Sequence, residues 1–253
     1  MKKFIFFILF TCLANAQDYS KLFNSLDSVQ KSQAVDHLRK IKKLINYEII
    51  KSGIKVGEKE FIKGVFFIDN QGKFSVIIID DKSKKYNDII SNIINNIPPS
   101  NCSKYFNEYT SFRFKLNEIS DLEKYYNELM EEEEINPQAF SELNTYPAFK
   151  KHKFLDNKEK ALEIFFNSMS KHIKENLNYP EKAMEENIQG KTNVYFLISK
   201  EGLIDEIYAF NAHPLLQLEG IRIIELLPKL IPASINGENK NVFYAQPLTF
   251  KLT

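Results

Sequence analysis

The stretch "VYFLISKEGLIDEIYAF", from Val194 to Phe210, decides the fold of the second half of the chain. Apolar residues alternate with other residues up to Gly202, and apolar residues resume after it. Alternation with a period of two indicates a strand with one buried face, and a glycine between two such runs is typical of a tight turn. The stretch therefore predicts a β-hairpin.

An earlier stretch, "VFFIDNQGKFSVIII" from Val65 to Ile79, has the same design. Phe66 and Phe196 are 130 positions apart, and so are Gly72 and Gly202. A constant offset that runs through strand and turn is the mark of an internal repeat. We therefore expect one structural unit that occurs twice in the chain.

A helix follows each predicted hairpin. Apolar residues recur at three-and-four spacing from Tyr86 to Ile97 and again from Leu216 to Leu227, which predicts amphipathic helices. Each pattern runs into a proline, Pro98 in the first case and Pro228 in the second, again 130 positions apart. Proline cannot continue a helix, so both helices are expected to end there.

Each unit closes with a short strand, "FRFKL" (112–116) in the first and "LTFKL" (248–252) in the second. We match Phe114 with Phe250, which are 136 positions apart. The predicted fold class is α+β, with two β-β-α-β units, each a three-stranded antiparallel sheet covered by a helix. The helix is needed because the apolar face of such a sheet must be buried.

The two units account for most of the chain. Residues 1–16, "MKKFIFFILFTCLANA", have a basic start, a short apolar run and a small-residue cleavage site, which predict a cleaved signal peptide and a mature chain that begins at Gln17. The apolar run is about half the length that a membrane-spanning helix needs. Residues 17–117 form the first unit, 118–145 an acidic helical linker and 146–253 the second unit. The linker's "EEEE" (131–134) is interpreted as a solvated helix face.

The composition argues against several classes of function. A formal net charge of +1 provides no general attraction to nucleic acid or to anionic lipid. Loss of the signal peptide leaves Cys102 as the single cysteine, so neither an internal disulfide nor a thiolate metal site is expected. The histidines have no metal-ligand spacing, and no glycine motif for phosphate or nucleophile chemistry occurs. We therefore expect no enzyme, with no catalytic residue, metal or cofactor.

The second unit resembles the TonB C-terminal domain of Bacteroidetes-type bacteria. The matching residues run in order from "YPAF" (146–149) through Tyr179-Pro180 and Gly202 to "HPLLQLEGIRIIELLPKLIPASINGENKNVFYAQPLTFKL" (213–252). Two positions depart from the family pattern: Leu230 stands where a Trp is usual, and Ala233 where a Gly is common. The first unit is similar to the family only through the repeated pattern.

The resemblance implies a periplasmic protein whose partner is a TonB-dependent outer-membrane receptor or another envelope protein. Such domains hold an extended receptor segment, the TonB box, which adds as a strand to a sheet edge. The residues expected to contact the peptide are Asn176, Asn178, Tyr179, Pro180, Val242, Tyr244, Gln246, Leu248 and Phe250. Two alternatives stay open. In one, the tyrosine-proline pair serves only as a helix stop and strand entry; in the other, the last strand is covered by the first unit or by a second subunit in a homodimer.

Two other functions are weighed against this binding module. The first is a structural protein of the cell envelope that uses the fold only for assembly. The second is a membrane-anchored energy transducer, which requires an uncleaved N-terminus. A force-transducing TonB also has a long spacer, whereas here a second unit occupies that place, so direct energy transduction is not expected.

Overall fold

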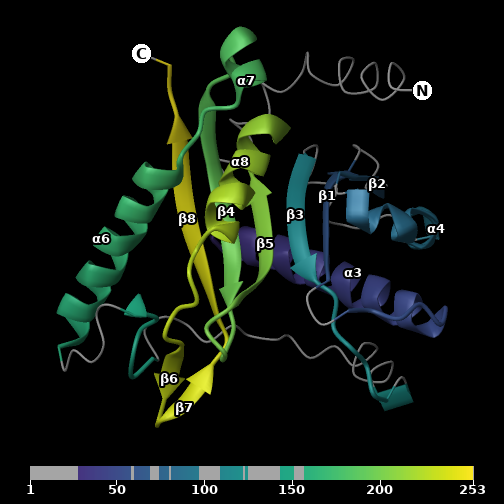
Figure 1. The fold of residues 1–253 in the computed structure, drawn as a ribbon, viewed down its shortest axis with the longest axis horizontal. Coiled ribbons are helices and arrows are strands. Elements are labelled where there is room, and N and C mark those ends of the chain that lie inside the picture. Colours follow the sequence, from purple (N-terminus) through teal and green to yellow (C-terminus); the bar gives the residue numbers. More distant parts are fainter. Residues whose placement is uncertain are drawn as a thin grey trace.

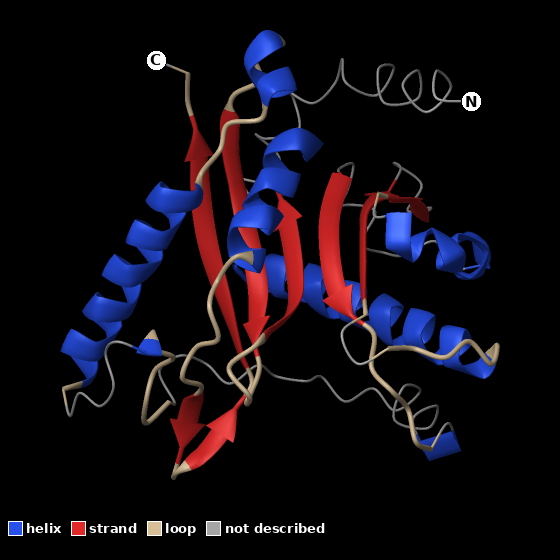
Figure 2. Cartoon of the chain, in the orientation of Figure 1, coloured by secondary structure: helices blue, strands red, loops and turns tan. Residues whose placement is uncertain are grey.

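The computed structural model describes residues 28–57, 60–68, 74–79, 81–96, 109–121, 123–124, 143–150 and 157–252. Its centre is one six-stranded sheet with the strand order β2-β1-β3-β5-β4-β8, and helices lie against the sheet (Figures 1 and 2). Several predicted features lie outside these residues: the signal peptide, Gly72, Pro98, Cys102 and the "EEEE" run. No described helix is long and apolar enough to span a membrane.

The elements fall into two groups along the chain. The first half contains α3 (Ser28–Lys51), β1 (Phe61–Ile68), β2 (Phe74–Ile78), the 3₁₀ helix η2 (Asp81–Tyr86), α4 (Asn87–Asn96) and β3 (Tyr109–Lys115). The second half contains α6 (Lys158–Asn176), α7 (Glu181–Glu185), β4 (Gly190–Ile198), β5 (Ile204–Phe210), α8 (Pro214–Glu225), β6 (Ala233–Ile235), β7 (Glu238–Lys240) and β8 (Val242–Phe250). Both predicted hairpins and both predicted helices are present.

The two halves have the same strand arrangement. In each, the first strand of the hairpin lies in the middle and pairs antiparallel with the other two: β1 with β2 and β3, and β4 with β5 and β8. The β-β-α-β order of both units agrees with the sequence pattern. Descent of both from one duplicated unit stays a prediction.

The register corrects one detail of the predicted match. Phe114 lies opposite Ile62 on β1, whereas Leu248 lies opposite Thr192 on β4. Ile62 and Thr192 are 130 positions apart, so Leu248 is the counterpart of Phe114, and the match with Phe250 was wrong by two residues. A slip of two residues keeps every side chain on the same face, so the alternation alone could not reveal it.

The two sheets also differ from the prediction because they join into one. Strand β3 pairs antiparallel with β5, from Ser111 opposite Ala209 to Phe114 opposite Glu206. We call this pairing the seam. Because the counterparts β3 and β8 run in opposite directions in the joined sheet, the second half is turned over relative to the first. Helices α4 and α8 consequently cover opposite faces of the sheet. Figure 1 shows α3, which shares the first core with α4, behind the sheet and α8 in front of it.

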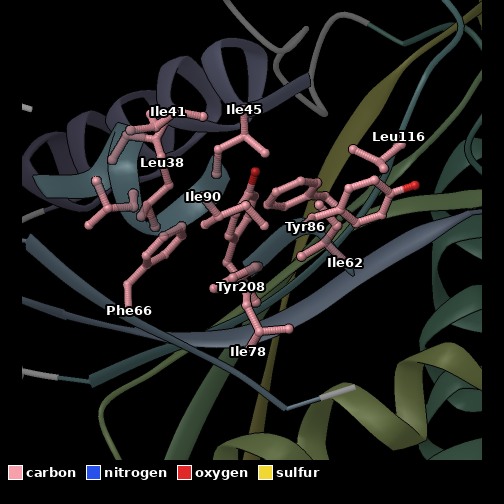
Figure 3. Packing of buried hydrophobic residues seen from close by; sticks show 14 of the residues in the cluster. Leu38, Ile41, Ile45, Ile62, Phe66, Ile78, Tyr86, Ile90, Leu116 and Tyr208 are labelled. Carbon is pink, nitrogen blue, oxygen red and sulfur yellow. The ribbon is translucent and has the colours of Figure 1, made fainter. Parts of the chain in front are cut away.

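Each face of the sheet has its own core. The first core packs α3 and α4 on the first half and extends across the seam to the β5 residues Tyr208 and Phe210 (Figure 3). The second core packs α6, α7 and α8 on β4, β5 and β8. Phe66 and Phe112 stack in the first core with ring centroids 4.1 Å apart. The seam therefore lies between two cores, so both faces of β5 are buried.

Short local signals account for the ends of the later elements. The Nδ1 atom of His213 accepts a hydrogen bond from the Leu215 N–H at 3.2 Å, so this histidine caps α8, and Pro214 occupies the first turn. Asn236 and Gly237 have positive φ angles of 51° and 82°, as a tight turn between two strands requires. They connect β6 to β7 in a small separate sheet, a hairpin that the sequence analysis did not include.

Candidate peptide-binding edge

Strand β8 is at one end of the sheet. It pairs with β4 along nine residues, from Val242 to Phe250, and no other described strand pairs with its outer side. Unpaired N–H and C=O groups at a sheet edge can pair with another chain. This side of β8, which we call the outer edge, is therefore the candidate binding site.

One hydrogen bond determines which residues of β8 face the outer edge. Beyond the paired part of β4 and β5, the Ser199 N–H donates to the Leu203 carbonyl at 2.8 Å, so the backbone of Ser199 faces β5. Backbone groups of successive strand residues face opposite neighbours, so Val194 and the other even residues of β4 face β8. They lie opposite the even residues of β8, such as Gln246. The backbone groups at the outer edge thus belong to odd residues: Phe243, Ala245, Pro247 and Thr249.

The predicted contact residues on β8 are all even. Val242, Leu248 and Phe250 are at most 3% exposed and belong to the hydrophobic cores. Tyr244 is half-buried, with its ring centroid 5.4 Å from that of Phe165 on α6, and burial raises its pKa to about 12. The side chains of these four residues therefore pack against the cores. A peptide paired with the outer edge would bind the backbone groups of the odd residues between them.

The other predicted contacts, Asn176 to Pro180, form a tightly held turn after α6. Arg222 on α8 binds both carboxylate oxygens of Glu219, at 2.7 Å each. It also donates to the Asn176 carbonyl at 2.5 Å. Glu219 accepts from the Asn178 N–H at 2.8 Å. The polar groups of this turn are thus used for holding it against α8.

Tyr179 connects this turn to the far end of β8. Its hydroxyl donates to the Ile188 carbonyl at 2.7 Å, and its ring meets that of Phe250 edge-on, with centroids 5.7 Å apart. Pro180 then begins α7 as its N-cap. The structure thus brings Tyr179 close to the last residue of β8 and gives it a packing role there.

The opposite edge of the second half, β5, is covered by the first half. Glu206 on β5 is 4% exposed, and its carboxylate lies 2.7 Å from Lys42 Nζ and 3.2 Å from Arg39 Nε, both on α3. Burial by itself would raise the pKa of Glu206, but Lys42 and Arg39 lower it, and the net shift is downward. The second half therefore depends on cations from the first half to keep this carboxylate charged.

A second set of bonds closes the seam on the α8 side. Glu225 at the end of α8 pairs with Lys63 on β1 at 2.8 Å and with Arg113 on β3 at 3.0 Å. Gln217, which is 1% exposed, accepts from the Ser111 N–H at 2.8 Å and donates to the Tyr109 carbonyl at 2.9 Å. The two halves are thus joined by strand pairing and by polar contacts on both faces.

A cleft of about 210 Å³ lies beside the seam and is lined by charged residues that include Arg113, Asp205 and Glu225. Burial raises the pKa of Asp205, although Lys115 and Lys42 act in the opposite direction. Arg113 binds Glu225 and lies over the Phe61 ring, 3.5 Å from its centroid. The charges of Arg113 and Glu225 thus have partners within the protein, and no substrate is needed to explain them. Among the described residues, no three His, Cys, Asp or Glu side chains are grouped to hold a metal.

Comparison with protein families identifies the part of the chain that contains β8. Residues 175–252, from the end of α6 past β8, match the family model described as Gram-negative bacterial TonB protein C-terminal. The second half of the chain contains a TonB C-terminal domain. This family consists of non-catalytic periplasmic domains that interact with outer-membrane receptors. Neither the search of curated proteins nor that of solved structures found a match.

Sequence reasoning missed the residues that hold this TonB domain in place. Glu206 lies within the predicted strand "IDEIYAF", and a Glu among mostly apolar residues there indicates a buried charge that needs a partner. Gln217 and Glu219 lie on the predicted α8, but their partners on β3 and after α6 are distant in sequence. Spacing within α8 could not identify those partners.

Proposed function

We propose that the chain is a non-catalytic periplasmic binding module. Its TonB C-terminal domain would take up an extended segment of an outer-membrane receptor, a TonB box, or a similar segment of another envelope protein. The observation that supports this most directly is the outer edge of β8, which no described strand pairs. An extended peptide placed there would continue the antiparallel sheet through main-chain hydrogen bonds.

The first half has the role of a brace in this proposal. It covers the β5 edge through β3 and holds Glu206 from α3. Of the two strands at the ends of the sheet, β2 belongs to the first half, outside the family match, and β8 lies within it. Partner binding would therefore occur at β8 alone.

The proposal includes export by residues 1–16 as a cleaved signal peptide. The sequence features of this segment support it, and the family's periplasmic location agrees. N-terminal sequencing of the exported protein is expected to begin at Gln17. A chain that still begins at Met1 in the membrane fraction would instead favour the anchored transducer.

Peptide titration tests the binding function. Purified mature chain would be titrated calorimetrically with a TonB-box peptide and with the same peptide N-methylated at alternate residues. N-methylation removes N–H donors and leaves the side chains in place, so main-chain pairing predicts that the methylated peptide binds at least about tenfold more weakly, the loss expected for two hydrogen bonds. Absence of binding at high micromolar peptide would contradict the proposal.

A matched pair of variants tests whether the peptide binds at β8. The backbone of Ala245 faces the outer edge, so Ala245→Pro removes an outward N–H without removing a bond to β4. Ala245→Ser keeps that N–H and serves as the control. We expect Ala245→Pro to weaken peptide binding and Ala245→Ser to leave it within twofold. Equal binding by both would place the peptide elsewhere.

The seam supports a second candidate, a structural protein of the envelope. One sheet edge of each half is already used for assembly within the chain. A protein that extends this mode would join copies through β8 and would show a mass that rises with concentration in sedimentation. The binding module, by contrast, is expected to sediment as a monomer both with and without peptide.

A further inference from the structure

The outer edge of β8 is interrupted at its third outward-facing residue. Pro247 has no N–H group, and its carbonyl accepts a hydrogen bond from the Nε2 of Gln246 at 3.0 Å. A partner strand would find no donor at this position, and the Gln246 amide would compete with it for the Pro247 carbonyl. The remaining outward groups fall into two parts: Phe243 and Ala245 on one side of Pro247, and Thr249 on the other.

The seam shows how an uninterrupted edge of this kind pairs. Arg113 lies opposite Lys63 on β1, and Pro247 lies opposite Asn193 on β4. Lys63 and Asn193 are 130 positions apart, so Arg113 is the counterpart of Pro247. The Leu116 N–H bonds to the Glu60 carbonyl, so the even residues of β3 face β1, and Arg113 faces β5, where it lies opposite Ile207. The edge of β3 that pairs in the seam thus has an N–H at the position where the outer edge of β8 has a proline.

The part of the edge before Pro247 has an aromatic wall. Phe166 on α6 is 41% exposed, and its ring centroid lies 6.1 Å from that of Tyr244. Tyr244 lies between Phe243 and Ala245 on the strand. A strand added there would direct alternate side chains toward α6. An apolar side chain of the partner would find contact area on Phe166.

We infer that a partner strand pairs only with the Phe243–Ala245 part of β8 and places an apolar side chain against Phe166. The inference rests on the proposed function and narrows it. Pro247 and Gln246 limit the length of the paired segment, and Phe166 selects its side chain. The partner is a short extended peptide with an apolar residue on the face toward α6.

Amide hydrogen exchange followed by NMR tests the length of the paired segment. The purified mature chain would be compared with and without a TonB-box peptide. We expect added protection at the Phe243 and Ala245 amides and none at Thr249. In the variant Pro247→Val, which restores the missing N–H, protection should extend to Val at position 247 and to Thr249. The affinity should rise about two- to tenfold, the effect of one hydrogen bond.

A second pair of variants tests the aromatic wall. Phe166→Ala should weaken binding about three- to tenfold through the lost apolar contact. Met184→Ala is the control: Met184 is similarly exposed, at 44%, and lies on α7 near the far end of β8 (Figure 1). It should leave the affinity unchanged.

Three results would overturn the inference while the proposed function stands: protection of Thr249 in the natural chain, no gain for Pro247→Val, or equal losses for Phe166→Ala and Met184→Ala. If neither the natural chain nor Pro247→Val binds peptide, the proposed function fails, and the inference fails with it.

Discussion

Glu206 is the residue that most directly couples the two halves. Its carboxylate is buried on β5 and bound by Lys42 and Arg39 of α3, and the Tyr208 hydroxyl donates to it at 3.2 Å. Removing one member of a buried ion pair leaves the others charged without compensation, which costs more than the pair itself contributes. The stability of the whole sheet should therefore respond to this one side chain.

We predict that Glu206→Gln lowers the free energy of unfolding by about 3–5 kcal/mol, because the buried Lys42 and the partly buried Arg39 lose their counter-charge. Urea unfolding of the purified chain measures this. Glu163→Gln on the exposed face of α6 is the control and should stay within about 0.5 kcal/mol. Equal midpoints for both variants would contradict the role of Glu206.

The same residue implies a pH dependence with a definite sign. The folded state lowers the pKa of Glu206, so the unfolded chain takes up this proton more readily. The stabilisation is therefore complete above the unfolded value, near pH 4.5, and is lost as the pH falls through the folded pKa. Because Glu206→Gln cannot titrate at this position, the stability difference between natural chain and variant should shrink in acid.

At the scale of elements, the local patterns predicted the parts of the fold but not how they join. Alternation around Gly202 predicted β4 and β5, and three-and-four spacing predicted α8. The seam could not be predicted in this way, because a strand has the same alternation at an edge and in the middle of a sheet. The pairing of β3 with β5 depends on contacts about 100 residues apart in sequence.

The candidate site, like the fold, could be predicted only in part. The resemblance identified β8 as the strand to consider, and the structure places it at the end of the sheet. The residue list selected the even positions, whose side chains are largely buried. The choice between even and odd depends on which neighbour each backbone group faces, and that follows from hydrogen bonds in the structure such as the one from Ser199 to Leu203.

The β4–β5 turn allows a test of why Gly202 is a glycine. Its φ is +77°, and a Cβ added there would lie 2.0 Å from the Leu230 carbonyl oxygen. Gly237 has a similar φ of +82° but has no atom within 4 Å of an added Cβ. The two positions share the conformational cost of a left-handed residue, and only Gly202 adds a clash with backbone.

We predict that Gly237→Ala costs about 1–2 kcal/mol, the cost of the left-handed conformation alone. Gly202→Ala should cost roughly twice as much or more, because the turn must separate from Leu230, whose N–H donates to the Gly202 carbonyl at 2.9 Å. Thermal and urea unfolding of both variants measure the difference. Equal losses would mean that the Leu230 segment shifts freely.

At the scale of the whole molecule, the contacts that stabilise the fold extend beyond the residues that match the family. Residues 175–252 match the TonB family, yet the face of β5 that carries Tyr208 and Phe210 is buried by the first half. Both residues are at most 2% exposed. The second half alone would expose these rings, an uncompensated Glu206 and an unpaired β5 edge.

We predict that residues 146–253, produced alone, associate or unfold at a lower urea concentration than the full chain, because exposed apolar faces and open strands pair with other copies. Sedimentation and urea unfolding measure this.

The double substitution Tyr208→Lys with Phe210→Lys separates the effect of the exposed rings from that of the open strand. It should keep residues 146–253 monomeric, since the exposed face becomes charged. It should destabilise the full chain, where both positions are buried. A short piece that is monomeric without these substitutions and as stable as the full chain would show that the brace is dispensable, and the β5 edge would then become a second site open to partner strands.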